Sequence, residues 1–456
     1  MEKKIKSVTP FSRLEGEKRS KIVKRHIALG AIYKILAVGL SFIVVPLTIN
    51  YLTIEEYGIW MTLLSVISWF TFFDIGLGHG LRNKLAEAVT IEDMRLAKTY
   101  ISTAYFAIIL ISILLFVIFV VVLPFLSLEK IFNTKSVSNT ELLGLVLSVF
   151  FFFSVNFILS LCKQIFYAYQ KASLVAFQQV LFSLISLIGV LILIRYTTGR
   201  LFYLSIIYGS AMLLSNLILT YFFFKKHEEI KPSINSIDIR KIKEIISLGG
   251  KFFVIQIAVV IIFSTDSMII IQVLGPSEVT SYNIVYKLFS IITIGHSIIM
   301  APLWSAFTQA YVKKDNKWIQ SVLKKLNMLM IPVLIAVLFL IYFSRDIVDF
   351  WVGPEVKFDF LLALLMGIYI VISIWNNNFS YILGGISKVR LGTVYTVFTS
   401  AINIPISIYF ARKMGVSGVI LGTICSIGIS AILSPIQVWY FIFTKKRTLL
   451  LDRLLS

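Results

Sequence analysis

The stretch FAIILISILLFVIFVVVLPFL, residues 106–126, runs for 21 residues without a charged side chain. A helix needs about 20 apolar residues to cross the hydrocarbon core of a bilayer. A transmembrane β-strand instead alternates apolar and polar residues over about ten positions, and this stretch does not alternate. Because no water satisfies backbone groups inside a bilayer, such a run predicts a membrane-spanning helix.

Similar runs recur along the whole chain, and the composition agrees with them. Of the 456 residues, 58% are hydrophobic and 14% are charged, whereas a soluble domain usually contains about 25% charged residues. The mean hydropathy is +0.89. We therefore expect an all-α polytopic membrane protein with twelve transmembrane helices. The twelve stretches lie at about 27–51, 57–77, 99–123, 142–162, 174–194, 201–224, 248–274, 279–308, 326–344, 358–384, 391–411 and 417–443.

The formal net charge of +20 is distributed in a way that indicates membrane topology. With the N-terminus placed in the cytoplasm, 33 of the 43 lysines and arginines fall in inner segments and 8 in outer loops. This bias is the positive-inside rule, so we expect a multi-pass protein of the cytoplasmic (inner) membrane with both termini in the cytoplasm. The charge then attracts anionic membrane lipids, and we expect no nucleic-acid partner.

The longest interior polar segment, residues 225–245, divides the predicted helices six and six. The tetrapeptides IALG at 27–30 and ISLG at 246–249 open the first and seventh stretches, so the halves resemble each other, with chance similarity of apolar helices as the alternative. Transporters built from parallel repeats often bind substrate between the halves. We expect two six-helix lobes around a central cavity. The expected parts are a basic N-terminus (1–26), the first lobe (27–224), a cytoplasmic linker (225–247), the second lobe (248–443) and a cytoplasmic tail (444–456).

Motifs for nucleotide or metal binding are missing from the sequence. The chain has no G-x-x-x-x-G-K-[ST] loop, and its two cysteines, Cys162 and Cys425, have no spacing typical of a metal site. We therefore expect no cofactor and no metal. The energy for transport has to come from an ion gradient or from the gradient of the substrate itself.

Three glycines lie where the second apolar stretch meets a charged one, in FFDIGLGHGLRNKLAEA, residues 72–88. A dinucleotide-binding loop would follow a strand and have a glycine at position 81, which is Leu81 here. On physical grounds the segment is the cytoplasmic end of a helix, where the glycines allow a bend or close packing.

The same segment resembles the membrane flippases of polysaccharide biosynthesis, the Wzx-type O-antigen and teichuronic-acid-type exporters of the multidrug/oligosaccharidyl-lipid/polysaccharide superfamily. The stretches YLTIEEYGIW (51–60) and STDSMIIIQVLGPSEVTSYNIVYKLF (264–289) are also similar to passages of that family. The motif residues are Asp74, Gly76, Gly78, Leu81, Arg82 and Lys84.

The resemblance implies a transporter rather than an enzyme. Its substrate would be an undecaprenyl-pyrophosphate-linked oligosaccharide, moved from the inner to the outer leaflet by alternating access. The expected partners are the polysaccharide polymerase and the chain-length machinery, with H⁺ or Na⁺ as the coupling ion. Asp74 and Arg82 of the motif become candidate substrate contacts at the inner mouth of the cavity.

Ionisable side chains inside the predicted spans are further candidates, because each costs about 2.5–3.5 kcal/mol at mid-span unless it faces a cavity or a partner. Lys34 and Lys251 lie toward the inner side as candidate contacts for pyrophosphate, with a snorkelling or interfacial lysine as the alternative. Asp266 and Lys287 are expected at equal depth. They form either a salt bridge or a site in which Asp266 couples to an ion and Lys287 contacts substrate. His296 is a second candidate for coupling, or else a hydrogen-bonded packing residue.

The tenth stretch contains WNNNFSYILGG at 375–385. Three consecutive asparagines point to different faces of a helix, so either the helix is interrupted or one side lines a wet cavity. Hydrogen bonds between helices are the alternative role. The candidate contacts to sugars are Trp375, Asn376, Asn377 and Asn378.

Two other functions compete with the flippase. A drug/cation antiporter of the same superfamily would need acidic cavity residues, whereas the candidates here are lysines as much as carboxylates. A membrane glycan polymerase would typically have a long outer loop with catalytic residues. The longest expected outer loop has about 18 residues, which argues against the polymerase.

Overall fold

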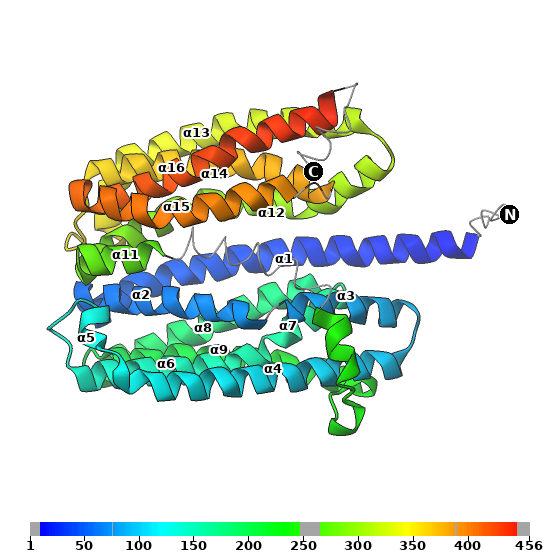
Figure 1. Cartoon of the computed structure of the whole chain (residues 1–456), viewed down its shortest axis with the longest axis horizontal. Coiled ribbons are helices and arrows are strands. Elements are labelled where there is room, and N and C mark those ends of the chain that lie inside the picture. Colours follow the sequence, from blue (N-terminus) through cyan, green and yellow to red (C-terminus); the bar gives the residue numbers. More distant parts are fainter. Residues whose placement is uncertain (1–9, 75, 247–264, 387, 389, 445–456) are drawn as a thin grey trace.

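The computed structural model describes residues 10–74, 76–246, 265–386, 388 and 390–444, and all regular structure in this part of the chain is helical (Figure 1). The elements of the first half are α1 (Pro10–Tyr51), α2 (Ile54–Phe70), the 3-10 turn η1 (Thr71–Asp74), α3 (Leu77–Thr90), α4 (Met94–Val122), η2 (Leu123–Phe125), α5 (Leu128–Ile131), α6 (Asn139–Leu159), α7 (Leu161–Ala168), α8 (Ala172–Tyr196) and α9 (Leu201–Lys226). Those that follow are η3 (Glu228–Ile230), η4 (Ile234–Ser236), α11 (Asp266–Val273), α12 (Pro276–Val312), α13 (Asn316–Val352), α14 (Phe360–Gly385), α15 (Arg390–Met414), α16 (Val416–Val438) and the π-helical turn η5 (Trp439–Phe443).

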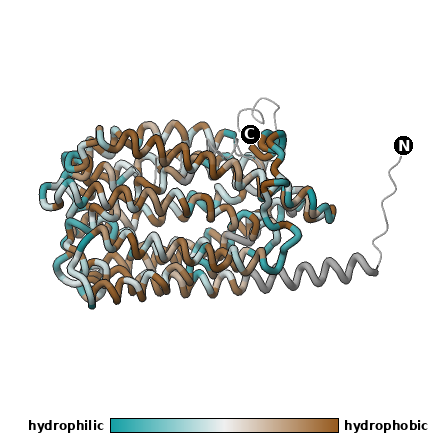
Figure 2. The backbone as a smooth tube through the Cα atoms, turned by 90° about the horizontal axis from the view of Figure 1, so that it is seen from below, coloured by the Kyte–Doolittle hydropathy of each residue, from teal (hydrophilic) through white to brown (hydrophobic). Residues whose placement is uncertain are grey.

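Ten helical segments of the described residues are long and apolar enough to cross a membrane. This confirms that the chain is an all-α polytopic membrane protein. The expected spans 57–77 and 248–274 are not among the ten. α2 has only 17 residues before η1 begins, and most of the span 248–274 lies outside the described residues. Figure 2 shows polar residues gathered at the two ends of the helices and apolar residues along their length.

Local sequence signals explain where several helices begin. Asp93, Ser138 and Asp315 each accept a backbone N–H bond at the N-cap of α4, α6 and α13. Each such bond satisfies an amide of the first turn that would otherwise have no partner. The long apolar faces that follow are then buried against other helices, which supplies most of the stability of a helix in a folded protein.

The helices form two bundles with α1 between them (Figure 1). We call α2–α9 the first bundle and α11–α16 the second bundle. α1 packs along α8 of the first bundle, and α2 of the first bundle packs against α12 of the second. Residues far apart in the sequence therefore meet along α1 and α2.

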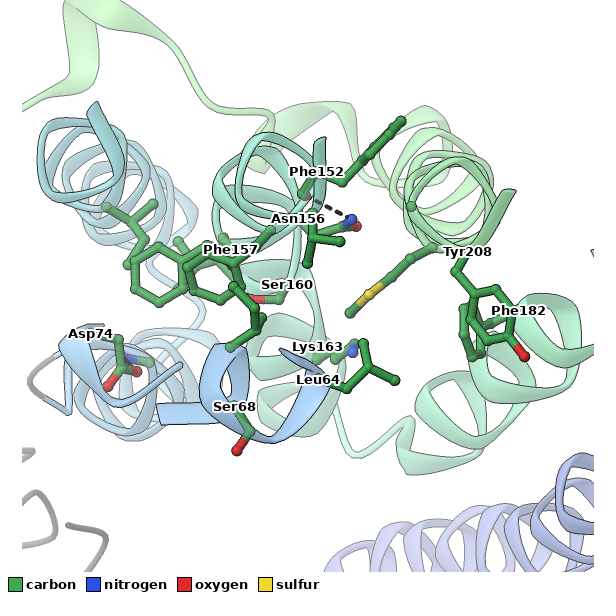
Figure 3. A pocket seen from close by; sticks show the side chains of 18 of the residues that line it. Leu64, Ser68, Asp74, Phe152, Asn156, Phe157, Ser160, Lys163, Phe182 and Tyr208 are labelled. Carbon is green, nitrogen blue, oxygen red and sulfur yellow. Dashed lines mark hydrogen bonds between the residues drawn. The ribbon is translucent and has the colours of Figure 1, made fainter. Parts of the chain in front are cut away.

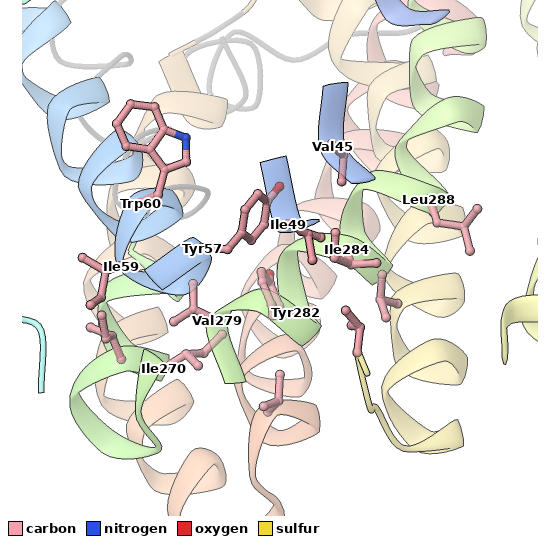
Figure 4. Close-up of a cluster of buried hydrophobic side chains, with 14 of the residues drawn as sticks. Val45, Ile49, Tyr57, Ile59, Trp60, Ile270, Val279, Tyr282, Ile284 and Leu288 are labelled. Carbon is pink, nitrogen blue, oxygen red and sulfur yellow. The ribbon is translucent and has the colours of Figure 1, made fainter. Parts of the chain in front are cut away.

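Apolar side chains of both bundles form one core where α1 ends and α2 begins, which we call the bridging cluster. Fully burying a side chain of this size stabilises a fold by about 1.5–3 kcal/mol. Gly58 of α2 approaches α12 so closely that a Cβ atom would lie 1.8 Å from the carbonyl oxygen of Pro276. Figure 4 shows members from four helices, namely Val45, Ile49, Tyr57, Ile59, Trp60, Ile270, Val279, Tyr282, Ile284 and Leu288.

Toward the opposite end, the core divides into two. One cluster, with Leu81, Ile101 and Ile165, belongs to the first bundle and the segment after it. The other, with Phe307 and Phe441, belongs to the second bundle. As far as the described residues show, neither cluster contains a side chain of the other bundle. We call the end with the bridging cluster the closed end and the other the split end.

The segment after α9, residues 228–246, is docked on α4 of the first bundle. Thr103 Oγ1 accepts a hydrogen bond from the backbone N–H of Asp238 at 3.0 Å. Ser102 Oγ accepts one from the N–H of Ser233 at 3.0 Å, and the Tyr100 hydroxyl donates to Glu244 Oε2 at 2.9 Å. The connection between the bundles is thus fixed to the first bundle over residues 233–244.

Replacing Thr103 tests this docking. Thr103→Val leaves the N–H of Asp238 without its partner, which costs about 1–3 kcal/mol. We expect limited proteolysis within residues 228–246 to become faster. Thr99→Val is the matched control, because Thr99 Oγ1 bonds the carbonyl of Arg95 one turn earlier on the same helix, α4. Equal cleavage rates in the two variants would contradict the docking.

The same docking predicts a pH dependence. Hydrogen bonds from Lys241 and Tyr100 hold the pKa of Glu244 below its usual value. Because the folded-state pKa is lowered, the contact stabilises the docked segment above the unfolded-state pKa of about 4.3. The stabilisation is lost as the pH falls through the folded-state pKa. We expect protection of residues 228–246 from proteolysis to decline below about pH 4 in the natural chain and to change less with pH in Glu244→Gln. Identical dependence of protection on pH in the two proteins would contradict a role for Glu244.

Candidate functional site

Polar contacts between the bundles accompany the bridging cluster at the closed end. Asn133, in the segment after α5, donates from Nδ2 to the carbonyl oxygen of Ile271 in α11 at 3.0 Å. Gln272 Nε2 donates in return to the carbonyl oxygen of Lys130 at 2.9 Å. The connection between α4 and α6 therefore holds the second bundle against the first.

A cavity of about 250 Å³ lies between the bundles beside this closed end. Asp266 in its wall is 4% exposed. The hydroxyl of Tyr282 donates to Asp266 Oδ2 at 2.5 Å, and Thr423 Oγ1 lies 3.2 Å from Oδ1. A buried carboxylate held by hydroxyl groups can bind a proton or a small cation. The lining residues are Met61, Leu64 and Ser65 of α2, with Asp266, Ser267, Tyr282, Asn283, Tyr286 and Tyr369 of the second bundle.

Of the two alternatives for Asp266 and Lys287, the salt bridge is wrong. Lys287 Nζ donates instead to the carbonyl oxygen of Ser41 in α1 at 3.0 Å and lies 5.4 Å from the centre of the Phe42 ring. The two residues lie on adjacent helices as expected, but their side chains have different partners. Asp266 turns toward α16 and Lys287 turns toward α1.

Lys34 also connects α1 with α12. Its Nζ donates to Ser297 Oγ at 2.7 Å. Ser41 lies two helical turns after Lys34 on α1, and both residues contact α12, through Lys34 Nζ and the carbonyl of Ser41. Two lysines thus lie along the contact between α1 and the second bundle, toward the split end from Asp266.

Asp74 ends η1 and caps α3. Its Oδ1 accepts the backbone N–H of Gly76 at 2.9 Å, and its Oδ2 accepts that of Gly78 at 3.2 Å. Gly76 has φ 76°, a left-handed conformation that glycine adopts without steric cost. The expected bend after the second span is therefore confirmed, and the carboxylate holds the backbone of this bend.

Arg82, the other motif residue expected to contact substrate, lies on the exposed face of α3. Its guanidinium carbon is 4.9 Å from the centre of the Tyr167 ring, so it makes a cation–π contact. Lys251 lies outside the described residues.

The asparagines at 376–378 lie in a continuous helix, because α14 runs unbroken from Phe360 to Gly385. Asn376 Oδ1 accepts from Ser434 Oγ at 3.1 Å, and Trp375 Nε1 donates to the carbonyl of Ala431 at 3.0 Å. Both bonds join α14 to α16, which is the interhelical role. Asn377 is partly exposed.

Asn378 pairs with the one histidine expected to couple to an ion. Its Oδ1 lies 2.8 Å from His296 Nε2, and both side chains are buried, with exposures of 1% and 5%. The bond joins α12 to α14. His296 thus has the hydrogen-bonded packing environment named as its alternative.

A larger cavity, of about 560 Å³, lies inside the first bundle. Figure 3 shows Lys163 pointing into it, with Asn156 and Leu64 nearby and Asp74 across the view. Sequence reasoning missed Lys163 by counting it in a cytoplasmic loop, whereas it lies in α7, which continues the line of α6 inside one candidate span, Asn139–Ala168. The aromatic residues of the wall are Trp60, Phe152, Phe153, Phe157, Phe182 and Tyr208.

The fold is shared with solved transporters. An inward-facing structure of a multidrug resistance MATE family transporter of the MOP superfamily matches with a TM-score of 0.73 at 14% identity, covering 91% of this chain and 96% of that one. An outward-facing structure of such a transporter matches with a TM-score of 0.63, covering 90% and 94%. At this identity the likeness shows a MATE-like fold.

Sequence relatives extend over most of the chain. The chain is 22% identical to a "Putative O-antigen export protein" of Yersinia pseudotuberculosis, over 78% of this chain and 82% of that protein. It is 22% identical to a "Putative O-antigen transporter" of Salmonella typhi, over 86% and 91%. The MatE family matches residues 252–409. The family described as polysaccharide biosynthesis protein matches residues 23–306, more than half of the chain, and the protein belongs to this family.

Proposed function

We propose that the protein is a flippase, which moves an undecaprenyl-pyrophosphate-linked oligosaccharide, such as an O-antigen repeat unit, across the cytoplasmic membrane. Membership of the polysaccharide biosynthesis family and the names of the two bacterial relatives support this function. In this proposal both termini are cytoplasmic. Twelve spans arise from the ten candidate segments, α2, and the stretch at 248–274. The domains keep the boundaries 1–26, 27–224, 225–247, 248–443 and 444–456.

The division of the hydrophobic core is the observation that best supports alternating access. One cluster bridges the bundles at the closed end, and two independent clusters stabilise them at the split end. By the positive-inside rule, the split end would face the cytoplasm. A substrate from the inner leaflet can then enter between the bundles, and repacking the bridging cluster would open the other side. Bundles with their own cores can rock as rigid bodies about such a contact.

The lysines at the contact between α1 and α12 are the substrate contacts that the geometry favours. Among the described residues, the ammonium groups of Lys34 and Lys287 bond to one hydroxyl and one carbonyl oxygen, so a pyrophosphate could exchange for these neutral partners. Arg82 and Lys251 would then attract the anion at the inner mouth, with Asp74 fixing the bend beside them. The sugars would be bound by residues of α14 once its hydrogen bonds to α16 are replaced by bonds to the substrate. These residues are Trp375, Asn376, Asn377 and Asn378.

Coupling to H⁺ or Na⁺ would occur at Asp266. Its carboxylate lines the cavity between the bundles. Its two partners are neutral hydroxyl groups, so the negative charge of Asp266 could bind a cation. His296 would be a secondary coupling site through its bond to Asn378. The polymerase and the chain-length machinery would receive the translocated unit on the outer side.

A deletion strain tests the function. Without the protein, we expect the intact undecaprenyl-pyrophosphate-linked unit to accumulate in the inner leaflet, measured by its accessibility to a membrane-impermeant glycan-modifying enzyme in oriented vesicles. Restoring the natural gene should clear the accumulation. Outer-leaflet accumulation of single units would indicate a polymerase instead.

Substitutions at Asp266 test the coupling. In proteoliposomes with an imposed H⁺ or Na⁺ gradient, Asp266→Asn should lower translocation to the rate measured without a gradient, because the side chain that would bind the cation has lost its charge. Asp266→Glu should retain part of the rate. Asp346→Asn is the control, because Asp346 lies on an exposed face of α13. A rate in Asp266→Asn that still follows the gradient would exclude this carboxylate.

The cavity at Asp266 also favours a second candidate, a cation antiporter. One carboxylate with the rings of Tyr282, Tyr286 and Tyr369 is suited to an organic cation, because cations bind to aromatic faces. In that case the deletion strain would become sensitive to cationic drugs and would accumulate no lipid-linked unit.

A further inference from the structure

The cavity of the first bundle contains a lysine with no counter-ion. In the described part of the chain, Lys163 Nζ has no hydrogen-bond or ion-pair partner. The acidic side chain that shares the cavity, Asp74, uses both oxygens on the N–H groups of Gly76 and Gly78. A charge that lies among apolar side chains inside a membrane span is unfavourable unless an anion or a polar group joins it.

The remaining walls are suited to an amphipathic guest. Six aromatic side chains form much of the wall, and the volume of about 560 Å³ falls within the range of small-molecule sites. Gln164, next to Lys163, also lines the cavity, and its Oε1 is buried without a hydrogen-bond partner. The unpaired groups are thus one cation and one acceptor on adjacent residues of α7.

Other polar groups of the wall are already engaged. Asn156 donates to the carbonyl of Phe152 at 2.9 Å and accepts from Asn216 at 3.1 Å. Ser160 donates to the carbonyl of Phe157 at 2.8 Å. Asn156 and Ser160 therefore form part of the wall, whereas Lys163 Nζ and Gln164 Oε1 can still form hydrogen bonds to a ligand.

We propose that this cavity is a binding subsite for the phosphate group of the lipid-linked glycan, with Lys163 as its counter-ion. The sugar attached to the phosphate packs against the aromatic walls, and one of its hydroxyl groups donates to Gln164 Oε1. This inference rests on the proposed flippase function and adds that the ligand enters the first bundle in addition to the space between the bundles.

A phosphate ester can come from the translocated substrate or from an ordinary anionic phospholipid. The aromatic wall and the acceptor of Gln164 favour the substrate, because an ordinary phospholipid has no sugar ring to pack against aromatic side chains. α2 supplies Leu64 to this cavity and also to the cavity at Asp266, so a ligand in the first bundle lies next to the wall that both cavities share.

Binding to the purified protein in phosphatidylcholine nanodiscs tests the subsite. The probe is a short-chain polyprenyl-pyrophosphate-linked hexosamine, and native mass spectrometry gives its Kd. Lys163→Gln should raise the Kd about 30-fold, because a buried charge pair loses one partner, and Lys163→Arg should remain within about threefold. Lys84→Gln is the matched control, because Lys84 at the same end of the bundle pairs with Glu87 outside the cavity.

An unchanged Kd in Lys163→Gln, with the thermal stability of the natural chain, would overturn the subsite. Equal displacement of the probe by phosphatidylglycerol would assign the cavity to bilayer lipid and would also overturn it. In cells that express Lys163→Gln in place of the natural protein, we expect the lipid-linked unit to accumulate in the inner leaflet. If the deletion strain itself accumulates none, the flippase function fails. If the deletion strain accumulates the lipid-linked unit but the Lys163→Gln strain does not, the flippase function stands and the subsite fails.

Discussion

Apolar packing between the two bundles exists at one end of the molecule, and the remaining arrangement depends on it. The bridging cluster holds α1 and α2 against α11 and α12, and the close approach at Gly58 requires that no side chain intervene. Each bundle also has its own core at the split end. The proposed alternation would therefore exchange the contacts between the bundles and leave these two cores intact.

The intramembrane charges follow from the same constraint. A charge between helices is retained only where another group compensates it, and Lys34, Asp266 and Lys287 each find polar partners on a neighbouring helix. These partners, three hydroxyl groups and one carbonyl, are all neutral. A neutral partner holds a charge less firmly than an opposite charge, so these contacts can exchange for an ion or a phosphate. Lys163 is the extreme case, with no such partner among the described residues.

Ten of the twelve helical spans and the bend at Asp74 could be predicted from the sequence, because both depend on local properties. α1 ends at Tyr51, where the first apolar stretch ends, and Gly76 has the backbone that only glycine adopts easily. The partners of Asp266 could not be predicted. The sequence spacing indicates how deep Asp266 lies in the membrane. Its partner Thr423 is 157 positions away, and only the packing of the helices decides that Asp266 faces Thr423. Lys163 was missed because α7 continues inside the bundle after the apolar stretch at 142–162 ends.

Reversible cross-linking of the closed end tests alternation most directly. In a chain with Cys162→Ala and Cys425→Ala, Asn133→Cys and Gln272→Cys would join the bundles where Asn133 now bonds to α11. Ser112→Cys and Ser154→Cys, within the first bundle, are the control pair. Alternating access predicts that a short cross-linker at the closed end stops translocation of the lipid-linked unit, that reductant restores it, and that the control pair has no effect. Undiminished translocation with the closed end cross-linked would contradict the account.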